Sequence, residues 1–524
     1  MKLMVWYRKW LIDCVTESCS LHGRPAMKPN HLSPLALLQF SWQAIQVAFY
    51  LDVGIAFLTM KWLKLWERYS TLIVSLMGVM AGGALLLAVI RYWRFTYRLT
   101  DGGLTINKGL VNRQVQHIPY RQIQTIQRQQ SWFLQPWHLE QLIIETAEKV
   151  SEDDLIQLPL VRQTVGDELI AHQRQSQNAT ASKHGDQSVQ SEPATQRLRV
   201  SWHDLNVYAL SSVNIVLIMG VVAWFGQQVF DAGRGGVWRR MTSLVGQWSV
   251  WQISMAVGVV MLVSYACVYA QIMAQYYHFT IERRATVVTV TRGWLQRREA
   301  SVALSRIQAV KLQQNWLRQW LHLTTVQVVT ASQVGDTEDN NELKLLPVVP
   351  QSQALTTVSR FIDWVPTMIT NLTSLDRRAR WAVIRNCLLL WSGLLLVLGL
   401  IVLKISRQSL SWLLISLPIW VAVAVLQGSY ASHWRGAAIS SDVILILKTS
   451  HFFTRQQWVL PRSQVQALII KQSWWMRASH SAHLQVSIRD GRHERTITVR
   501  YLPTTMVRQI QGWYVPNDKA LNVN

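Results

Sequence analysis

One motif is written three times in this chain, and its three copies align without a gap. They read "YRQIQTIQRQQSWFLQPWHLEQLIIETA" from residue 120, "LSRIQAVKLQQNWLRQWLHLTTVQVVTA" from 304 and "RSQVQALIIKQSWWMRASHSAHLQVSIR" from 462. Each copy places a glutamine two positions before a tryptophan: Gln130 and Trp132, Gln314 and Trp316, and Gln472 and Trp474. A repeat at wide spacing constrains the architecture before any local pattern is considered. The chain is therefore predicted to contain three copies of one structural unit.

The residues around each motif predict a β-rich unit that ends in a helix. Upstream runs such as "RFTYRLTDGGLTINKG" alternate with a period of two, which is typical of strands, and "DGG" is a hairpin turn. Downstream, each copy has a Leu-Pro pair, at 158–159, 346–347 and 502–503. A helix-like stretch follows each pair, and proline suits the first turn of a helix. We expect a small antiparallel barrel or sandwich that a C-terminal helix covers.

Six apolar stretches come in pairs and predict membrane-spanning helices. Half of all residues are hydrophobic and only 15% are charged, whereas soluble domains carry about 25% charged residues. A span needs roughly 20 apolar residues, and the qualifying stretches are 41–63 and 71–90, 207–229 and 250–272, and 386–403 and 409–427. Short loops join each pair, so we expect three helical hairpins. Both termini and all three β-units then lie on one side of the membrane.

The basic charge predicts which side that is. The formal net charge is +23, which fits either nucleic acid or an anionic membrane surface. The apolar runs favour the membrane, and charge spread along the helix flanks disfavours nucleic acid. Arginines cluster where the helices meet the β-units: Arg91, Arg94, Arg98, Arg197, Arg199, Arg377, Arg378, Arg380 and Arg385. Because basic residues near helix ends stay inside the cell, we expect a multi-pass cell-membrane protein with cytoplasmic β-units and termini.

Three segments fall outside the repeated pattern. Residues 1–34 form an N-terminal segment that lacks the continuous apolar core of a signal peptide, and Met27 is an alternative start. Residues 172–200 are rich in Gln, Ser and Ala, which predicts a disordered linker. The polar insert at 332–342 is expected to be a hairpin loop of the second β-unit.

The motifs together resemble the bacterial pleckstrin-homology (PH) domain family of membrane proteins. The resemblance is carried by "YRLTDGGLTINKG", "IPYRQIQ", "QSW" and "LIIET" in the first copy. Three hairpins with three such domains resemble the YdbT-like members. The second copy has "IERRATV" in place of the "DGG" turn, and the third has "HSAHL" where the first has "WHLEQL". These motifs are signatures of a fold and carry no catalytic chemistry.

The resemblance implies a fold, a location and a partner. Each unit would have two roughly orthogonal antiparallel sheets closed at one end by a helix. The protein would sit in the plasma membrane, paired with a smaller relative that carries one such domain. Family members are connected with envelope stress or antimicrobial-peptide tolerance, but no molecular activity follows from that, because a fold does not determine a function.

The predicted organisation is an α+β membrane protein in which each hairpin precedes one PH-like unit. The transmembrane hairpins occupy 35–91, 201–273 and 380–428, and the PH-like β-barrels or sandwiches occupy 92–171, 274–367 and 429–516.

The motif residues admit a structural and a functional interpretation. The tryptophans Trp132, Trp316 and Trp474 are expected first to pack, then to dock at the membrane interface, and last to contact a ligand. The glutamines Gln130, Gln314 and Gln472 are expected to satisfy backbone groups at the same junction, since buried polar side chains need partners.

Three further sets of residues are candidates for function. Asp52 lies inside a predicted span, where a carboxylate is a functional candidate, unless the span is shifted and places it near an interface or a neighbouring helix. Gly78 and Gly82 form a small-xxx-small pair that allows close helix packing. Five arginines of the second unit could contact anionic headgroups or simply set topology: Arg283, Arg284, Arg292, Arg297 and Arg298.

Motifs for catalysis and metal binding are not found. The sequence has no P-loop, no G-x-S-x-G and no H-E-x-x-H. His480 and His483 have H-x-x-H spacing but no third ligand nearby, and the four cysteines, Cys14, Cys19, Cys267 and Cys387, show no zinc or disulfide pattern. We expect no cofactor and no catalytic site.

These observations predict a non-enzymatic scaffold. It would bind a protein partner such as the smaller single-domain relative, and membrane lipids second, and it would serve envelope stress. The alternative is a transporter or exporter of a small or peptide substrate, for which Asp52 is the clear intramembrane candidate. A nucleic-acid partner is not expected.

Overall fold

A computed structural model describes residues 30–61, 66–109, 112–146, 156–182, 196–212, 250–331, 342–369, 372–405, 409–491 and 493–515. Three sequence predictions therefore lie outside the described residues: the alternative start at Met27, most of the predicted span 207–229, and residues 332–341 of the polar insert.

The same order of elements occurs three times, as the repeated motif predicts. Among the described residues, each unit has a short strand, two helices, three strands, a 3-10 turn, a strand, a short helical turn, two strands and a helix. The first unit comprises β1 (Asn30–His31), α2 (Ala36–Lys61), α3 (Trp66–Arg94), β2 (Thr96–Thr100), β3 (Gly103–Lys108), β4 (Gln114–Pro119), η1 (Tyr120–Gln122), β5 (Ile123–Ser131), η2 (Trp132–Trp137), β6 (Leu139–Thr146), β7 (Ile156–Arg162) and α4 (Gln163–Ser182).

The second and third units follow the same plan. The second comprises β8 (Gln196–Arg199), α5 (Trp202–Ser212), α8 (Val250–Tyr276), β9 (Thr280–Arg284), β10 (Val287–Arg292), β11 (Gln296–Ala303), η3 (Leu304–Arg306), β12 (Ile307–Gln314), α9 (Trp316–Trp320), β13 (Leu323–Thr330), β14 (Glu342–Pro350) and α10 (Ala354–Phe361). The third comprises β15 (Thr373–Ser374), α11 (Arg377–Ile405), α12 (Ser409–Trp434), β16 (Gly436–Ser441), β17 (Ile444–His451), β18 (Thr454–Pro461), η4 (Arg462–Gln464), β19 (Val465–Lys471), α13 (Trp474–Ala478), β20 (Ser481–Asp490), β21 (His493–Pro503) and α14 (Thr504–Tyr514).

The sheets cross the boundaries between units, which the sequence does not predict. The last three strands of the first unit join the first four of the second in one sheet, ordered β7-β6-β5-β11-β10-β9-β8. The second and third units share a sheet ordered β14-β13-β12-β18-β17-β16-β15. Only the four-stranded sheet β1-β2-β3-β4 and the three-stranded sheet β19-β20-β21 belong to one unit alone among the described strands. The expected PH-like β-sandwiches are therefore present, but they share sheets across their boundaries; the described strands form four sheets, together called the β-array below.

The two boundaries use the same register. Strand β5 pairs antiparallel with β11, and Gln130 lies opposite Arg297. Strand β12 pairs antiparallel with β18, and Gln314 lies opposite Arg455. Arg297 and Arg455 occupy equivalent positions when the three repeats are aligned. The motif glutamine therefore faces the same arginine position wherever one unit meets the next.

The motif forms a tight connection between two strands in every unit. After the glutamine comes a short helical turn, and then a histidine in the left-handed region: His138, His322 and His480 have φ of 51°, 54° and 48°. Histidine is among the residues that tolerate this region best. The glutamine amide donates to the backbone oxygen nine residues later, at 3.1 Å to Leu139, 3.0 Å to Leu323 and 3.1 Å to Ser481. This bond ties the end of one strand to the start of the next.

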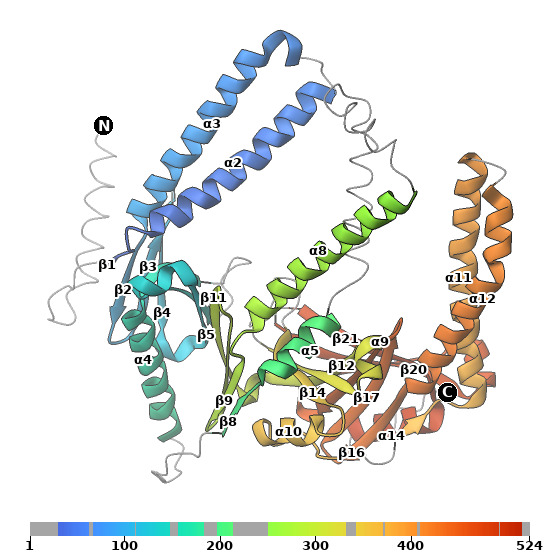
Figure 1. Cartoon of the computed structure of the whole chain (residues 1–524). Helices are drawn as coiled ribbons and strands as arrows, with labels where there is room; N and C mark the ends of the chain where they lie inside the picture. The colour runs from blue at the N-terminus through green and yellow to red at the C-terminus, as the bar shows by residue number, and fades with distance from the viewer. Residues whose placement is uncertain are drawn as a thin grey trace, which may run out of the picture.

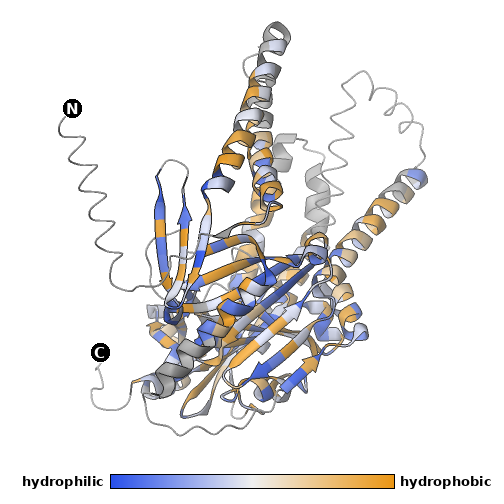
Figure 2. Ribbon diagram, turned by 90° about the vertical axis from the view of Figure 1, so that its left-hand side faces the viewer, coloured by the Kyte–Doolittle hydropathy of each residue, from blue (hydrophilic) through white to orange (hydrophobic). Residues whose placement is uncertain are grey.

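The long helices leave the β-array on the same side, as Figure 1 shows for α2 and α3, α8, and α11 and α12. Hydrophobic residues predominate along them, whereas the strands alternate between hydrophilic and hydrophobic residues (Figure 2). Three helical segments of the described residues are long and apolar enough to cross a membrane: Ser75–Arg94, Gly258–Tyr276 and Arg377–Leu400. Six spans were predicted, and the described residues contain two complete hairpins, α2–α3 and α11–α12.

The predicted linker at 172–200 is shorter than expected. Helix α4 continues through Ser182, and Gln196–Arg199 forms β8, which pairs with β9. Strand pairing supplies backbone hydrogen bonds, so this polar run enters the second unit as an edge strand. Only residues 183–195 of the predicted linker remain, and they lie outside the described residues.

The hydrophobic cores follow the shared sheets. The core of the second unit includes Val310 and Leu312 of β12 together with Val459 of β18 from the third unit. The core of the third unit in turn includes Ala309 and Val329 from the second. Because alternate residues of a strand face opposite sides of the sheet, each shared strand contributes to two cores. The units are therefore joined by apolar packing as well as by strand pairing.

Candidate functional site

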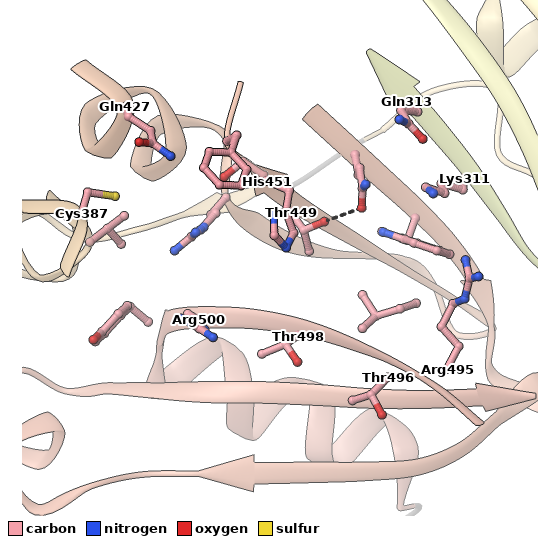
Figure 3. A pocket seen from close by; sticks show the side chains of 18 of the residues that line it. Lys311, Gln313, Cys387, Gln427, Thr449, His451, Arg495, Thr496, Thr498 and Arg500 are labelled. Carbon is pink, nitrogen blue, oxygen red and sulfur yellow. Dashed lines mark hydrogen bonds between the residues drawn. The ribbon is translucent and has the colours of Figure 1, made fainter. Parts of the chain in front are cut away.

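A cavity of about 1080 Å³ lies where the third hairpin meets the β-array. Its walls come from β12, β13 and β14 of the second unit, from β17, β18 and β21 of the third, and from α11 and α12. Figure 3 shows Cys387 and Gln427 of the helices on one side and Arg495, Thr496, Thr498 and Arg500 of β21 on another. The cavity exists because two units share a sheet at this point.

Strand periodicity places polar side chains in the cavity. Many lining residues lie two positions apart on a strand: Lys311 and Gln313, Glu342 and Lys344, Thr449 and His451, Gln456 and Trp458, and Thr496, Thr498 and Arg500; Ser450, Ile497 and Tyr501 also reach the cavity. Residues at this spacing lie on one face of a strand. Their neighbours on β12, Val310 and Leu312, face the apolar core of the second unit. One face of the shared sheet thus packs in the apolar core of the second unit, and the other carries the polar cavity beside the core of the third.

Positive charge predominates in the cavity. Its lining has five lysine and arginine side chains and a single carboxylate: Lys311, Lys344, Arg435, Arg495 and Arg500, and Glu342. A hollow lined by one sign of charge concentrates ligands of the opposite sign. The cavity therefore fits an anionic group.

The single carboxylate is held by cations from both units. Lys311 Nζ lies 2.8 Å from Glu342 Oε1 and 3.1 Å from Oε2, and Arg495 of the third unit also donates to Glu342. Burial pushes the pKa of Glu342 upward, but Lys311 and Arg495 outweigh burial, so its pKa falls below the ordinary value. Burial also lowers the pKa of Lys311, and Glu342 offsets only part of that effect. The carboxylate is ionised and shared, so it cannot neutralise the cavity.

Arg435 supplies positive charge at the foot of the third hairpin. It follows the last residue of α12, Trp434. Burial lowers the pKa of Arg435, and the neighbouring Arg500 lowers it further. Cys387 and Tyr501 offset part of this lowering of the pKa, and no Asp or Glu of the described residues is among its causes. A guanidinium has five donors in a planar fork and binds phosphate or carboxylate oxygens in pairs, so Arg435 is the leading ligand-binding candidate.

The cavity lies at the level where the helices enter their apolar segments. Leu390 of α11 and Gln427 of α12 belong to its lining, and both fall in predicted spans. Trp391 donates to Gln427 at 2.5 Å, and its ring lies 5.1 Å from that of Trp420. Tryptophan favours the membrane–water interface, so this site is expected at headgroup depth.

The motif tryptophans do not pack as expected. Their exposed fractions are 60% for Trp132, 59% for Trp316 and 79% for Trp474. The packing interpretation is therefore wrong for the tryptophans. The glutamines of the motif, and not its tryptophans, make the bonds that anchor this connection.

These exposed rings belong to turns that contact the feet of the hairpins. The Trp132 amide donates to Leu295 at 2.7 Å, and the amide of Trp294, next to Leu295, donates to Ala274 of α8 at 2.8 Å. In the next unit, Tyr430 of α12 donates to Gln319 of α9 at 2.8 Å. This placement favours docking of the tryptophans at the membrane interface.

The five arginine candidates do not form one patch. Arg283 and Arg284 lie at the β9–β10 turn, whereas Arg292, Arg297 and Arg298 lie at the β10–β11 turn at the other end of β10. A strand of six residues separates the two groups, roughly 17 Å apart. Arg283 donates to both carboxylate oxygens of Asp363 at 2.6 Å. Only the β10–β11 group lies near α8. There the Gly293 amide donates to the backbone oxygen of Tyr277, the residue after α8, at 2.9 Å.

The glycine pair is placed differently from the prediction. A methyl group added at Gly78 or Gly82 would meet nothing within 4 Å, so neither marks a close helix contact in this chain. The close approach lies instead at Gly428 of α12, where a Cβ would come within 2.7 Å of the Ile384 Cα on α11. Close packing depends on which helix face meets its neighbour, and the G-x-x-x-G pattern alone does not give that.

The remaining candidates stay separate from the cavity. Asp52 falls within α2, and its side chain is outside the described residues. His483 accepts a hydrogen bond from the Tyr501 amide at 3.1 Å, which is a structural role. The cavity residues escaped the sequence analysis because they come from six strands and two helices far apart in the chain; the polar residues at alternate positions of β12, β14 and β21 were the available signal.

This architecture defines a class of protein: a membrane protein in which helical hairpins alternate with PH-like β-units. The bacterial PH domain family model matches residues 48–177, 214–360 and 390–517. The chain therefore belongs to the bacterial PH domain family and carries three copies of its domain.

The chain is 22% identical over 457 residues to the UPF0699 transmembrane protein YdbT of Bacillus subtilis (strain 168), covering 84% of this chain and 90% of that protein. No solved structure matches the chain significantly.

Proposed function

We propose that this protein is a non-enzymatic, multi-pass scaffold of the plasma membrane whose cavity binds an anionic headgroup or phosphate. The observation that carries the proposal is the cationic cavity at the foot of α11 and α12. Lipid phosphates lie at the depth where such helices leave the apolar layer. A cavity with five cations and one carboxylate attracts them.

The three PH-like units are proposed to lie in the cytoplasm against the inner leaflet. Arg91 and Arg94 occupy the last turn of α3, and Arg377 and Arg378 begin α11. These residues stand where helices meet β-units, and basic residues at such positions favour the cytoplasmic side. A fluorescent protein fused to the C-terminus would fluoresce only in the cytoplasm, so a dark fusion with full expression would refute the orientation.

The physiological role proposed is envelope stress or antimicrobial-peptide tolerance, with protein partners as the first class of ligand. The two sheets that cross unit boundaries support a scaffold because they join the three units to one another. A deletion strain should become more sensitive to envelope antibiotics, and Arg435→Gln should fail to restore tolerance. Full rescue by that variant would show that the cavity is not needed for this role.

The headgroup proposal is tested by the thermal stability of the purified full-length chain. Short-chain phosphatidylglycerol should raise the Tm more than short-chain phosphatidylcholine, since binding to the folded state stabilises it. Inorganic phosphate alone tests whether the phosphate suffices without the lipid. Arg435→Gln should abolish the difference between the two lipids.

Arg284→Gln provides the matched control, since Arg284 is an exposed arginine that pairs with Glu282 at 3.0 Å outside the cavity. It should keep the wild-type response. Equal Tm shifts with both lipids in the wild type, or an unchanged response in Arg435→Gln, would overturn the proposal.

A further inference from the structure

Two of the strands at sheet edges, β4 and β19, have equivalents in the other units that are paired across a unit boundary, whereas they themselves end a sheet within the described residues. Strand β4 ends the four-stranded sheet of the first unit, and β19 begins the three-stranded sheet of the third. Strands equivalent to β4 in the other units are β11 and β18, which pair with the preceding unit. Strands equivalent to β19 are β5 and β12, which pair with the following unit. The chain thus presents, at its two ends, the two halves of a junction that it makes twice internally.

The register of that junction can be extended to the free edges. Gln472 is equivalent to Gln130 and Gln314, and Arg113 is equivalent to Arg297 and Arg455. At both internal boundaries this glutamine lies opposite this arginine. The same register would set Gln472 of one strand edge opposite Arg113 of the other.

Two residues that would face each other in this register are apolar and exposed. In this register Ile470 lies opposite Val115; their exposed fractions are 37% and 63%. The equivalent pair at the second boundary, Leu312 and Gln457, is buried at 8% each. Free edges are normally protected by charged residues, proline or a covering element. Exposed β-branched side chains at complementary positions indicate instead that these edges pair.

Within the described residues, no following unit contacts the turn after β19, whereas the equivalent turns of the first and second units each bond to the next unit. In the first unit, the Trp132 amide donates to Leu295 of the second unit at 2.7 Å. In the second, Gln319 donates to the Phe453 oxygen of the third unit at 2.8 Å. The corresponding turn of the third unit, α13, leaves Trp474 and Trp475 79% and 51% exposed. The exposed surface therefore extends from the strand edge to the turn, where Trp474 is more exposed than Trp132 (60%) and Trp316 (59%) at the two internal junctions.

A repeated junction is compatible with the membrane. The step from one unit to the next keeps the hairpins on the same side of the array (Figure 1). A further step of the same kind would keep the hairpins of a following copy on that side too. Head-to-tail contacts of this type close into rings or continue as filaments.

We propose that full-length chains associate head to tail, with β19 of one copy adding antiparallel to β4 of the next. The β-array then continues from copy to copy in the register of the internal boundaries. Addition of a strand to a free edge satisfies its backbone groups and lets the side chains select the register. A smaller membrane protein with one PH-like unit, the partner expected from the family resemblance, is the competing occupant of these edges.

The pairing is tested by cross-linking between two differently tagged copies in native membranes. Both carry serine in place of the native cysteines; one copy has Val115→Cys and the other has Ile470→Cys. A short thiol cross-linker should join the two tags in one species. The register control replaces Ile470→Cys with Ile469→Cys, because a neighbouring residue on a strand faces the other side of the sheet.

The result that supports head-to-tail pairing is cross-linking of the two tags by Ile470→Cys with loss of that product in the Ile469→Cys control. Equal cross-linking of both variants would overturn the register. Cross-linking of Val115→Cys only to another protein would assign the edge to a different partner and overturn self-association.

The mass of the purified full-length protein gives a second readout that does not depend on cross-linking. Wild type should sediment as an oligomer, whereas Ile470→Lys or Val115→Lys, which place a charge on one edge, should shift it to the monomer. Val443→Lys is the matched control, because Val443 is 54% exposed in the same unit but lies in the turn between β16 and β17. A monomeric wild type, or equal effects of all three lysines, would overturn the proposal.

Discussion

Glu342→Gln tests whether the cavity network joins the second and third units. This substitution removes the only carboxylate of the cavity lining and leaves Lys311 and Arg495 without their shared partner. The Lys311 and Glu342 side chains are only 9% and 10% exposed, and breaking a buried ion pair costs about 3–5 kcal/mol. Arg495 keeps Asp490 at 2.5 Å, which favours the lower end, about 3 kcal/mol. At about 2–4 °C per kcal/mol, the Tm should fall by roughly 6–12 °C.

Lys311→Met should behave differently, although it removes the other half of the same pair. Glu342 keeps Arg495, and the buried lysine whose pKa is lowered is replaced by an apolar side chain of similar length. We expect a loss below about 1 kcal/mol, because apolar replacement of a buried charge is often neutral. In the double variant, Lys311→Met should recover part of the loss caused by Glu342→Gln, with a coupling of about 1 kcal/mol or more.

The assay is thermal unfolding of the full-length protein followed by tryptophan fluorescence. Trp458 lies beneath the network, with Lys311 Nζ 5.2 Å from its ring centre; it is one of 26 tryptophans, so the fluorescence follows unfolding of the whole chain. Equal destabilisation by Lys311→Met and Glu342→Gln, or additive effects in the double variant, would refute the idea that one carboxylate serves two cations.

Three further predictions follow from single sites. The pKa of Glu342 in the folded state is lowered from 4.5. The ionised carboxylate therefore stabilises the fold above pH 4.5, and this stabilisation is lost as the pH falls through the folded-state pKa. In an acid titration, Glu342→Gln should not show this loss of stability. Gly428→Ala should destabilise the third hairpin by about 1–3 kcal/mol through overpacking, measured as a lower Tm, while Gly78→Ala, which meets nothing within 4 Å, should not. Gln314→Ala should cost about 1–3 kcal/mol by leaving buried oxygens unpaired; the same change at the exposed Gln472 should cost less in denaturant unfolding.

At the repeated motif, the sequence predicted the three related units but not the exposure of the tryptophans. The alignment around Gln130, Gln314 and Gln472 predicted three units, and the structure has the same connection in each. It could not predict that Trp132, Trp316 and Trp474 remain exposed. The burial of a tryptophan depends on which residues pack against it. The sequence alone does not distinguish a tryptophan that faces a hydrophobic core from one that faces a membrane interface.

The residues of the cavity were even harder to predict from the sequence. Arg435 was not singled out in the sequence, because nothing in its neighbourhood distinguishes it from the other arginines at helix ends. Its position beside Arg500 and opposite β12 arises only when α12, β21 and a strand of the preceding unit converge. The five arginines of the second unit look like one cluster in sequence, yet β10 separates them.

The sequence alone determined the triplication, the order of hairpin and β-unit, and the approximate limits of strands and long helices. These properties follow from local periodicity, since a period of two places side chains on a strand face and a long apolar run needs a helix in the membrane. The tertiary structure alone decided that β5 joins β11 and β12 joins β18, that a cationic cavity forms beneath α11 and α12, and that β4 and β19 end their sheets within the described residues. The physical reason is that the backbone of a strand edge can pair with any compatible edge, so the choice of neighbour depends on packing between residues far apart in the chain.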